Sequence, residues 1–299
     1  MKREPTGRKP GAESPRPDAR TAPPVPDELE WSNEMVVMAP PAAEGAAGPD
    51  PEWKPTPQDD VGFCDEGVVT SRNTVAILAS LLDPRSFAGE ELRRLGVKTQ
   101  DLRRLHGTAC IALTSPLAGE GKSTISVGLA AALAREPGRR VLLIEADLRC
   151  GALQRTLGIA HSQGLAEWLN GSIDYVPVRV LEPGGFFLLV AGQAQLERPE
   201  LLGSARMEGL LRAARGLFDF VILDATPVLP VADAVLIQDL VDGFLMVVCS
   251  RRTPKEAVRD ALGRLRADRV MGLVLNQHVG TDRSYQDQTY QAYVTKRGR

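Results

Sequence analysis

The sequence predicts an α/β fold with a mostly parallel central sheet and helices on both faces. Three observations support it: short apolar runs alternate with helical patterns over about 170 residues, a glycine-containing loop connects one run to a helix, and two runs end in carboxylates. The runs do not alternate with polar residues, which is typical of strands covered on both faces. Carboxylates at strand ends lie where open parallel sheets bind ligands.

The chain begins with a segment, residues 1–65, that we predict to be a disordered tail. Its first 60 residues hold 13 of the 22 prolines and few large apolar side chains. Such a composition buries too little apolar surface to offset the conformational entropy that folding removes. An apolar island at residues 28–38 is either a docking motif or a transient helix.

A helical lead-in is predicted for residues 66–107. Residues 75–82 are apolar, and residues 87–105 form an amphipathic pattern with leucines near helical spacing. Pro84 and Gly96 are expected to interrupt it.

The α/β domain is predicted for residues 108–280, and a flexible C-terminal tail for residues 281–299. Six strands are expected, at residues 109–113, 141–145, 186–190, 220–223, 244–249 and 271–275. Five helices are expected between them, at residues 123–135, 165–170, 205–217, 231–240 and 254–266.

The composition argues against several classes of protein. With 36 basic and 38 acidic residues the net charge is −2, so no global charge points to nucleic acid. No apolar run approaches the roughly 18 residues of a membrane helix, and the first residues lack the apolar core of a signal peptide. The four cysteines show no metal-ligand spacing and are interpreted as reduced. We therefore expect a cytoplasmic protein that reaches a membrane only through a partner.

The loop before the first helix of the α/β domain is typical of a phosphate-binding loop. Gly119 and Gly121 lack a Cβ, so backbone N–H groups can wrap a triphosphate, and the helix N-terminus adds attraction. Lys122 is expected to reach the β- and γ-phosphates, and the Ser123 hydroxyl to coordinate Mg²⁺. The strict pattern G-x-x-x-x-G-K-[ST] requires glycine where this chain has Pro116, so only its second half matches.

Acidic residues follow two of the apolar runs. Asp224 ends the run at residues 220–223 and is expected to hold the Mg²⁺ shell. Glu145 and Asp147 follow the run at residues 141–144, and carboxylates at i and i+2 along a strand point to the same side. One of the two could serve the metal while the other accepts a proton from an attacking hydroxyl.

Three of the four tyrosines lie in the last fifteen residues, in a polar segment with no apolar pattern. They are Tyr285, Tyr290 and Tyr293. A tyrosine there can reach an active site on its own or a neighbouring chain, and phosphorylation would add nearly two negative charges. Packing of the rings on the domain is the alternative interpretation.

Together these motifs resemble those of the bacterial tyrosine kinases of capsule and exopolysaccharide export, in particular the stand-alone cytoplasmic members. The sequence GEGKST at residues 119–124 resembles the Walker A motif of that family. LLIEADLR at residues 142–149 resembles its Walker A′ motif, and VILDATP at residues 221–227 its Walker B motif. Further segments follow in the family's order, at residues 164–171, 198–207, 230–234 and 272–276.

The resemblance implies a P-loop kinase that uses ATP and Mg²⁺ to phosphorylate tyrosines of its own C-terminal tail, here Tyr285, Tyr290 and Tyr293. The implied catalytic residues are Lys122, Glu145, Asp147 and Asp224, and the implied Mg²⁺ ligands are Ser123, Asp147 and Asp224. The implied nucleotide contacts are Gly119, Glu120, Gly121, Lys122, Ser123, Thr124 and Arg149, with Asn276 near the adenine by analogy with related ATPases. A homo-oligomer and activation by the cytosolic tail of a transmembrane chain-length regulator are also implied.

Some positions depart from the family pattern. Glu145 stands where the Walker A′ motif usually begins with Asp, and the E-x-x-R-x-x-R motif that starts at Glu90 ends in Gly96. Two other functions therefore stay open. A partition or positioning ATPase would carry an early signature lysine where this chain has Leu117. A non-catalytic, nucleotide-binding regulator of an export complex would account for Glu145 and Gly96.

Overall fold

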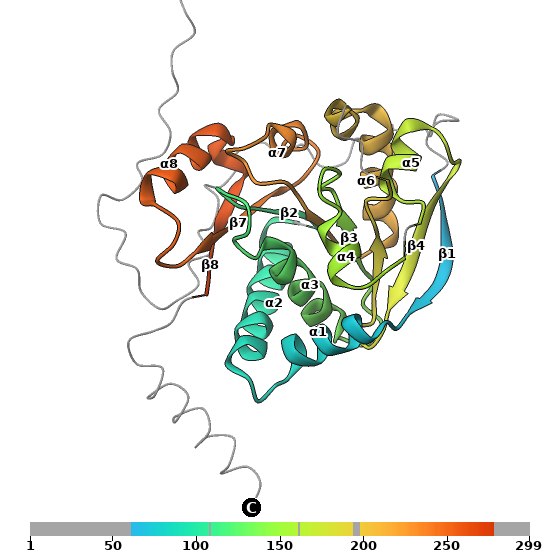
Figure 1. Cartoon of the computed structure of the whole chain (residues 1–299), viewed down its shortest axis with the longest axis horizontal. Helices are drawn as coiled ribbons and strands as arrows, with labels where there is room; N and C mark the ends of the chain where they lie inside the picture. The colour runs from blue at the N-terminus through green and yellow to red at the C-terminus, as the bar shows by residue number, and fades with distance from the viewer. Residues whose placement is uncertain (1–60, 108, 161, 194–197, 278–299) are drawn as a thin grey trace, which may run out of the picture.

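The computed structural model describes residues 61–107, 109–160, 162–193 and 198–277, which form one sheet with helices on both faces (Figure 1). The sheet has eight strands in the order β1-β4-β5-β3-β6-β2-β7-β8, and every neighbouring pair is parallel except β4 and β5. The strands are β1 (Gly62–Val69), β2 (Cys110–Thr114), β3 (Val141–Glu145), β4 (Tyr175–Leu181), β5 (Phe186–Leu189), β6 (Phe220–Asp224), β7 (Gly243–Cys249) and β8 (Val270–Asn276). The predicted α/β fold with a mostly parallel sheet is therefore confirmed.

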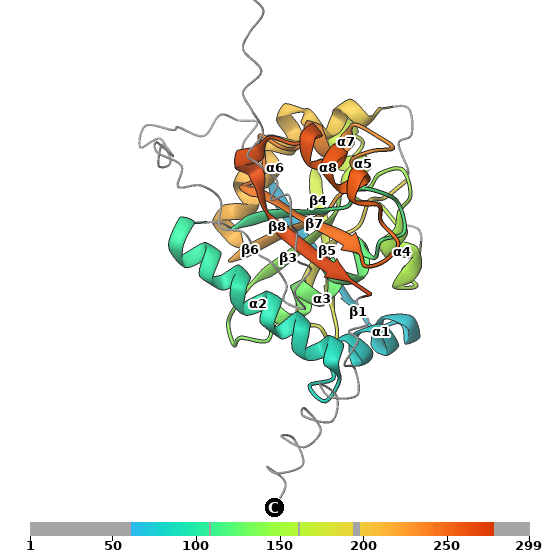
Figure 2. The ribbon, with the colours of Figure 1, turned by 90° about the vertical axis from the view of Figure 1, so that its left-hand side faces the viewer.

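The helices divide between the two faces of the sheet, as two perpendicular views show (Figures 1 and 2). One face carries α1 (Arg72–Leu82), α2 (Phe87–His106), α3 (Lys122–Ala134) and α4 (Ala152–Thr156). The other carries α5 (Leu165–Asn170), α6 (Ala205–Leu217), α7 (Asp233–Leu236) and α8 (Lys255–Arg264). Two short 3-10 helices, η1 (Pro199–Gly203) and η2 (Ala267–Arg269), complete the described elements.

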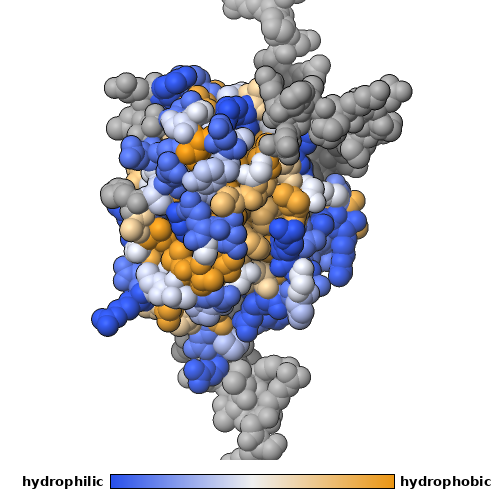
Figure 3. Space-filling model, turned by 90° about the vertical axis from the view of Figure 1, so that its right-hand side faces the viewer, coloured by the Kyte–Doolittle hydropathy of each residue, from blue (hydrophilic) through white to orange (hydrophobic). Residues whose placement is uncertain are grey.

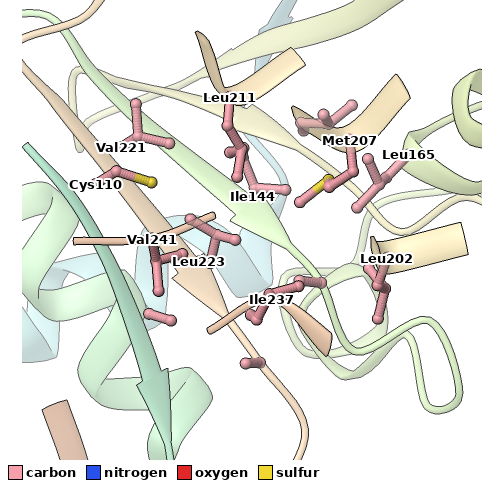
Figure 4. Packing of buried hydrophobic residues seen from close by; sticks show 14 of the residues in the cluster. Cys110, Ile144, Leu165, Leu202, Met207, Leu211, Val221, Leu223, Ile237 and Val241 are labelled. Atoms are coloured by element: carbon pink, nitrogen blue, oxygen red, sulfur yellow. The ribbon is translucent and has the colours of Figure 1, made fainter. Parts of the chain in front are cut away.

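Each face of the sheet has its own hydrophobic core, because successive strand residues point to opposite sides. In β3, Leu142 and Ile144 belong to the core under α5 and α6, whereas Leu143 belongs to the core under α2 and α3. The first core also contains Met207 and Leu211 of α6, which lie over the strands in Figure 4. Burial on both sides explains why these strands read as unbroken apolar runs.

All six predicted strands are present, and the structure adds β1 and β4. β1 runs across the boundary that we placed between the tail and the helical lead-in, so the chain from residue 62 to residue 69 is strand and not tail or helix. It forms one edge of the sheet and most of its residues are exposed, so its sequence lacks a buried apolar pattern. Figure 3 looks at this side of the molecule and shows hydrophobic side chains among hydrophilic ones. Val68 of β1 is 63% exposed. Its strand conformation follows from parallel pairing with β4, more than 100 residues away.

The two predicted lead-in helices are present as α1 and α2, but α2 continues through Gly96 without interruption. Gly96 is buried against α3, and a Cβ at this position would lie 3.5 Å from the Cβ of Ala132. Contacts along the α2–α3 interface therefore keep α2 helical at Gly96, although glycine has a low helix propensity. The helix predicted at residues 231–240 is confined to α7, Asp233–Leu236. Residues 1–60 and 281–299 lie outside the described residues.

The fold places the ends of three parallel strands side by side, because β3, β6 and β2 are neighbours in the sheet. In the strand register Asp224 pairs with Glu145 on one side and with Leu113 on the other. The phosphate loop follows β2 and the two groups of strand-end acids follow β3 and β6. The predicted motifs thus meet at one edge of the sheet, where ligands of open α/β folds bind.

Candidate active site

The phosphate loop connects β2 to α3, and its backbone needs glycine at two positions. Gly119 has φ +76° and Gly121 has φ +90°, a region that residues with a Cβ rarely adopt. A Cβ on Gly121 would also lie only 2.1 Å from Nδ2 of Asn276. Gly121 is the residue before α3, so the first N–H groups of that helix face the end of the loop.

Lys122 and Asp147 form a buried ion pair between the start of α3 and the loop after β3. The distance from Lys122 Nζ to Asp147 Oδ2 is 3.3 Å, and the two side chains are 11% and 5% exposed. Since a lone buried charge is costly, the pair keeps both ions at the mouth of the phosphate loop before any ligand arrives. An incoming polyphosphate would offer the lysine a second anion.

Asp224, at the end of β6, is fully buried beside this pair. Its Oδ1 accepts a hydrogen bond from Ser126 Oγ at 3.1 Å, while its Oδ2 has no partner among the described residues. The pKa of Asp224 is raised, because the effect of burial exceeds the lowering effects of the Lys122 charge and of the Ser123 and Ser126 hydroxyls. A buried carboxylate oxygen with no partner is an incomplete site. With the Ser123 hydroxyl close by, it fits a Mg²⁺ ion held directly or through water.

Glu145 lies at the end of β3, and its carboxylate is already fully engaged. Oε1 accepts hydrogen bonds from the backbone N–H groups of Leu153 at 2.6 Å and Gln154 at 3.4 Å, and Oε2 accepts one from Ala191 at 3.0 Å. Burial raises the pKa of Glu145 to about 7, against the lowering effect of these bonds. The structure therefore brings Lys122, Asp147 and Asp224 together, but it turns the Glu145 carboxylate to α4 and the end of β5.

Arg149 is also committed to a protein partner. Its Nε and Nη2 donate to the two carboxylate oxygens of Asp233 at 2.7 and 2.9 Å, a bidentate pair that connects the Walker A′ loop to α7. Asp233 is 3% exposed on its side chain. Our sequence analysis gave Asp233 no role, because Arg149 and Asp233 are 84 residues apart and no sequence pattern indicates that they are in contact.

Asn276 braces the phosphate loop from outside. Its Nδ2 donates to the carbonyl of Glu120 at 2.8 Å, and its Oδ1 accepts from the N–H of Gln277 at 2.9 Å. Two residues of the β7–α8 connection also contact the phosphate loop. Arg252 donates a hydrogen bond to the Gly119 carbonyl, and Thr253 donates one to the Glu120 carboxylate. The sequence analysis missed Arg252 and Thr253, which lie in a polar turn with no motif.

The other predicted residues are placed as follows. Thr124 is exposed in the first turn of α3, and Ser123 is half-buried next to it. Ser126, which we did not predict, was within reach of sequence reasoning because it lies four residues after Lys122 and so on the same helix face. Tyr285, Tyr290 and Tyr293 lie outside the described residues.

Comparison with known proteins shows the family of the chain. Residues 111–293 match the family described as the CobQ/CobB/MinD/ParA nucleotide binding domain. The chain is 30% identical to the tyrosine-protein kinase CpsD of Streptococcus agalactiae over 194 residues, which are 63% of this chain and 83% of CpsD. This chain belongs to the bacterial tyrosine kinases.

Two further relatives define how much of such kinases the chain represents. It is 36% identical to the succinoglycan biosynthesis transport protein ExoP of Rhizobium meliloti over 200 residues, 65% of this chain but 25% of ExoP. The chain thus spans about a quarter to a third of the length of the first curated relatives it matches. The kinase domain of Escherichia coli tyrosine kinase ETK aligns with a TM-score of 0.63 at 27% identity, covering 71% of this chain and 86% of that domain. No helix among the described residues of this bacterial tyrosine kinase has the length and apolar character needed to cross a bilayer.

Proposed function

We propose that this chain is a protein-tyrosine kinase that transfers phosphate from Mg·ATP to tyrosines of its own C-terminal tail and thereby regulates polysaccharide polymerisation or export. The observation that carries the proposal is the convergence of Lys122, Asp147 and Asp224 beside a phosphate loop, in a member of the tyrosine kinase family. Its relatives include a succinoglycan transport protein and the kinase CpsD, which supports the polysaccharide context.

Each residue of the site has a role in this proposal. The backbone N–H groups around Gly119 and Gly121 hold the phosphates, and Lys122 leaves Asp147 to contact the β- and γ-phosphates. Ser123 and Asp224 would hold Mg²⁺, which supplies positive charge to the transferred phosphoryl group. Asp147, once released by the lysine, is free to orient the metal shell or the acceptor hydroxyl.

The proposed phosphate acceptors are Tyr285, Tyr290 and Tyr293. The last described residue, Gln277, follows Asn276, whose side chain touches the phosphate loop. Seven residues lie between Gln277 and Tyr285, and the eight Cα-to-Cα steps that join the two span at most about 29 Å. Tyr285 can therefore reach the phosphate loop of its own chain, and acceptors on a neighbouring copy are the alternative. A homo-oligomer and docking to the cytosolic tail of a transmembrane chain-length regulator complete the proposal.

A nucleotide-gated regulator without kinase activity is the second candidate. It is favoured by Glu145, whose carboxylate is turned to backbone donors and does not face the phosphate loop. A partition-type ATPase has less support, because Leu117 occupies the position of that class's signature lysine.

The test is phosphotyrosine mapping by mass spectrometry after incubation of the purified chain with Mg·ATP. We expect phosphate on at least one of Tyr285, Tyr290 and Tyr293, and none in Lys122→Met, which loses the charge that holds the transferred phosphate. The same reaction is run with and without the cytosolic tail of a candidate transmembrane chain-length regulator.

One further variant serves as a control. Arg259→Met removes an exposed basic side chain from α8, outside the described site, and should leave phosphorylation unchanged. Bound ATP without phosphotyrosine in either reaction would exclude the kinase and leave the non-catalytic regulator. ATP turnover without phosphotyrosine would favour the ATPase.

A further inference from the structure

Helix α4 is a five-residue helix that a side chain from a neighbouring strand holds at its N-terminal end. Glu145 of β3 accepts the N–H groups of Leu153 and Gln154, which belong to the first turn and have no partner within the helix. The other oxygen of Glu145 accepts the N–H of Ala191, directly after β5. One carboxylate therefore fixes α4 to two strands of the sheet.

The C-terminal end of the same helix is held by the beginning of α1. The carbonyl of Leu157, the residue that follows α4, accepts hydrogen bonds from Ser71 Oγ and, at 2.8 Å, from Thr74 Oγ1. Thr74 is fully buried, and Ser71 also caps the N-terminus of α1. The contact joins segments more than 80 residues apart. An isolated helix this short is unstable in water, so α4 depends on what holds its ends.

The loop between Asp147 and α4 is short, and two of its N–H groups donate to Asp147. The N–H of Gly151, the residue before α4, donates to the carbonyl of Asp147 at 3.2 Å. The N–H of Cys150 donates to Asp147 Oδ1, also at 3.2 Å. The other oxygen, Oδ2, faces Lys122. A displacement of α4 would therefore move Asp147 directly.

We propose that Glu145 and Thr74 are positioning residues that hold α4 from its two ends and so place Asp147 opposite Lys122, and that Glu145 itself takes no part in proton transfer. The inference rests on the proposed function, because it assigns a role in the same site. The extra methylene of Glu over Asp, on the order of 1 Å of reach, lets this side chain contact α4 and Ala191 together. The departure from the family's usual residue is thus an adaptation to this brace.

The experiment compares Glu145→Asp and Glu145→Gln in the full chain. Amide hydrogen exchange of Leu153, Gln154 and Ala191 is measured without nucleotide, and steady-state phosphotransfer with Mg·ATP. We expect exchange to accelerate about tenfold in both variants. We also expect kcat to fall tenfold to a hundredfold in both, with KM for ATP within twofold of wild type, because a shift near 1 Å costs about that much.

Thr74→Val tests the other end of α4 without touching Glu145. It keeps the side chain's shape and removes the hydroxyl, so the α4 amides should exchange faster and kcat should fall in the same direction. Thr74→Ser keeps the hydroxyl and should restore both. The matched control is Thr99→Val, since Thr99 is equally buried and donates to the Leu95 carbonyl within α2, away from α4. It should change neither quantity.

Several results would overturn the proposal. An active Glu145→Asp beside a Glu145→Gln that loses about a thousandfold, with amide exchange unchanged, would make Glu145 a participant in the reaction. Unchanged exchange and unchanged kcat in both variants would show that no brace is needed. A wild-type chain without phosphotransfer would refute the proposed function alone, and the exchange comparison would then decide whether Glu145 and Thr74 hold α4. If the Glu145 variants do not fold, the Thr74 series decides it.

Discussion

At the scale of single residues, one contact explains both the shape of the phosphate loop and the place of Asn276. Gly121 takes a positive φ, and the amide of Asn276 lies where its Cβ would be. The two residues are therefore interdependent, although they are 155 positions apart. Asn276 was expected near the adenine, and its side-chain amide donates to the phosphate loop at the Glu120 carbonyl.

Gly121→Ala should weaken nucleotide binding at least tenfold. The new Cβ needs both a strained backbone and a displaced Asn276, which moves the Glu120 carbonyl and the first turn of α3. The measurement is a titration with a fluorescent ATP analogue. Gly138→Ala is the matched control, because Gly138 has φ +79° with open space around its missing Cβ. It should cost about 1–2 kcal/mol of stability and leave affinity unchanged. Equal affinities in the two variants would contradict the argument.

At the scale of elements, the sequence predicted those that are defined by local pattern and missed those that depend on distant partners. The central strands are apolar because both faces are covered, so their pattern is visible. β1 is an exposed edge strand and α4 has five residues, so neither has a pattern that a window of sequence reveals. The strand-end acids were found for the same reason as the strands. The contacts of predicted site residues, such as that of Arg149 with Asp233, depend on the folded chain and were not predicted.

The α2–α3 interface provides a matched pair of glycines for a test. Gly96→Ala adds a Cβ at an ordinary 3.5 Å from Ala132, and alanine favours a helix interior by about 0.5–1 kcal/mol, so stability should rise. Gly128→Ala places a Cβ 2.6 and 2.7 Å from both methyl groups of buried Leu92. Overpacking costs about 1–3 kcal/mol, so stability should fall. Thermal unfolding should show melting temperatures above and below that of wild type. A destabilised Gly96→Ala would mean that α2 and α3 lie closer than described.

At the scale of the whole molecule, the segment before α1 is an integral part of the sheet. β1 pairs with β4, the ring of Phe63 packs edge-on against Phe218 with 5.6 Å between centroids, and Glu66 pairs with Arg179. The candidate site lies at the ends of β3, β6 and β2, and β4 and β5 stand between β1 and β3 in the sheet order. Stability and ligand binding should therefore respond differently to the loss of β1.

Two shortened chains that begin at residue 61 and at residue 70 isolate the contribution of β1. The second lacks the strand, exposes the edge of β4 and loses the Phe63–Phe218 contact, so its melting temperature should be several degrees lower. Its urea m-value should also be smaller, because less surface is exposed on unfolding. Affinity for a fluorescent ATP analogue should be the same in both. Equal melting temperatures and m-values would show that β1 contributes nothing to the sheet. A loss of affinity would show instead that the edge strand supports the phosphate loop across the whole sheet.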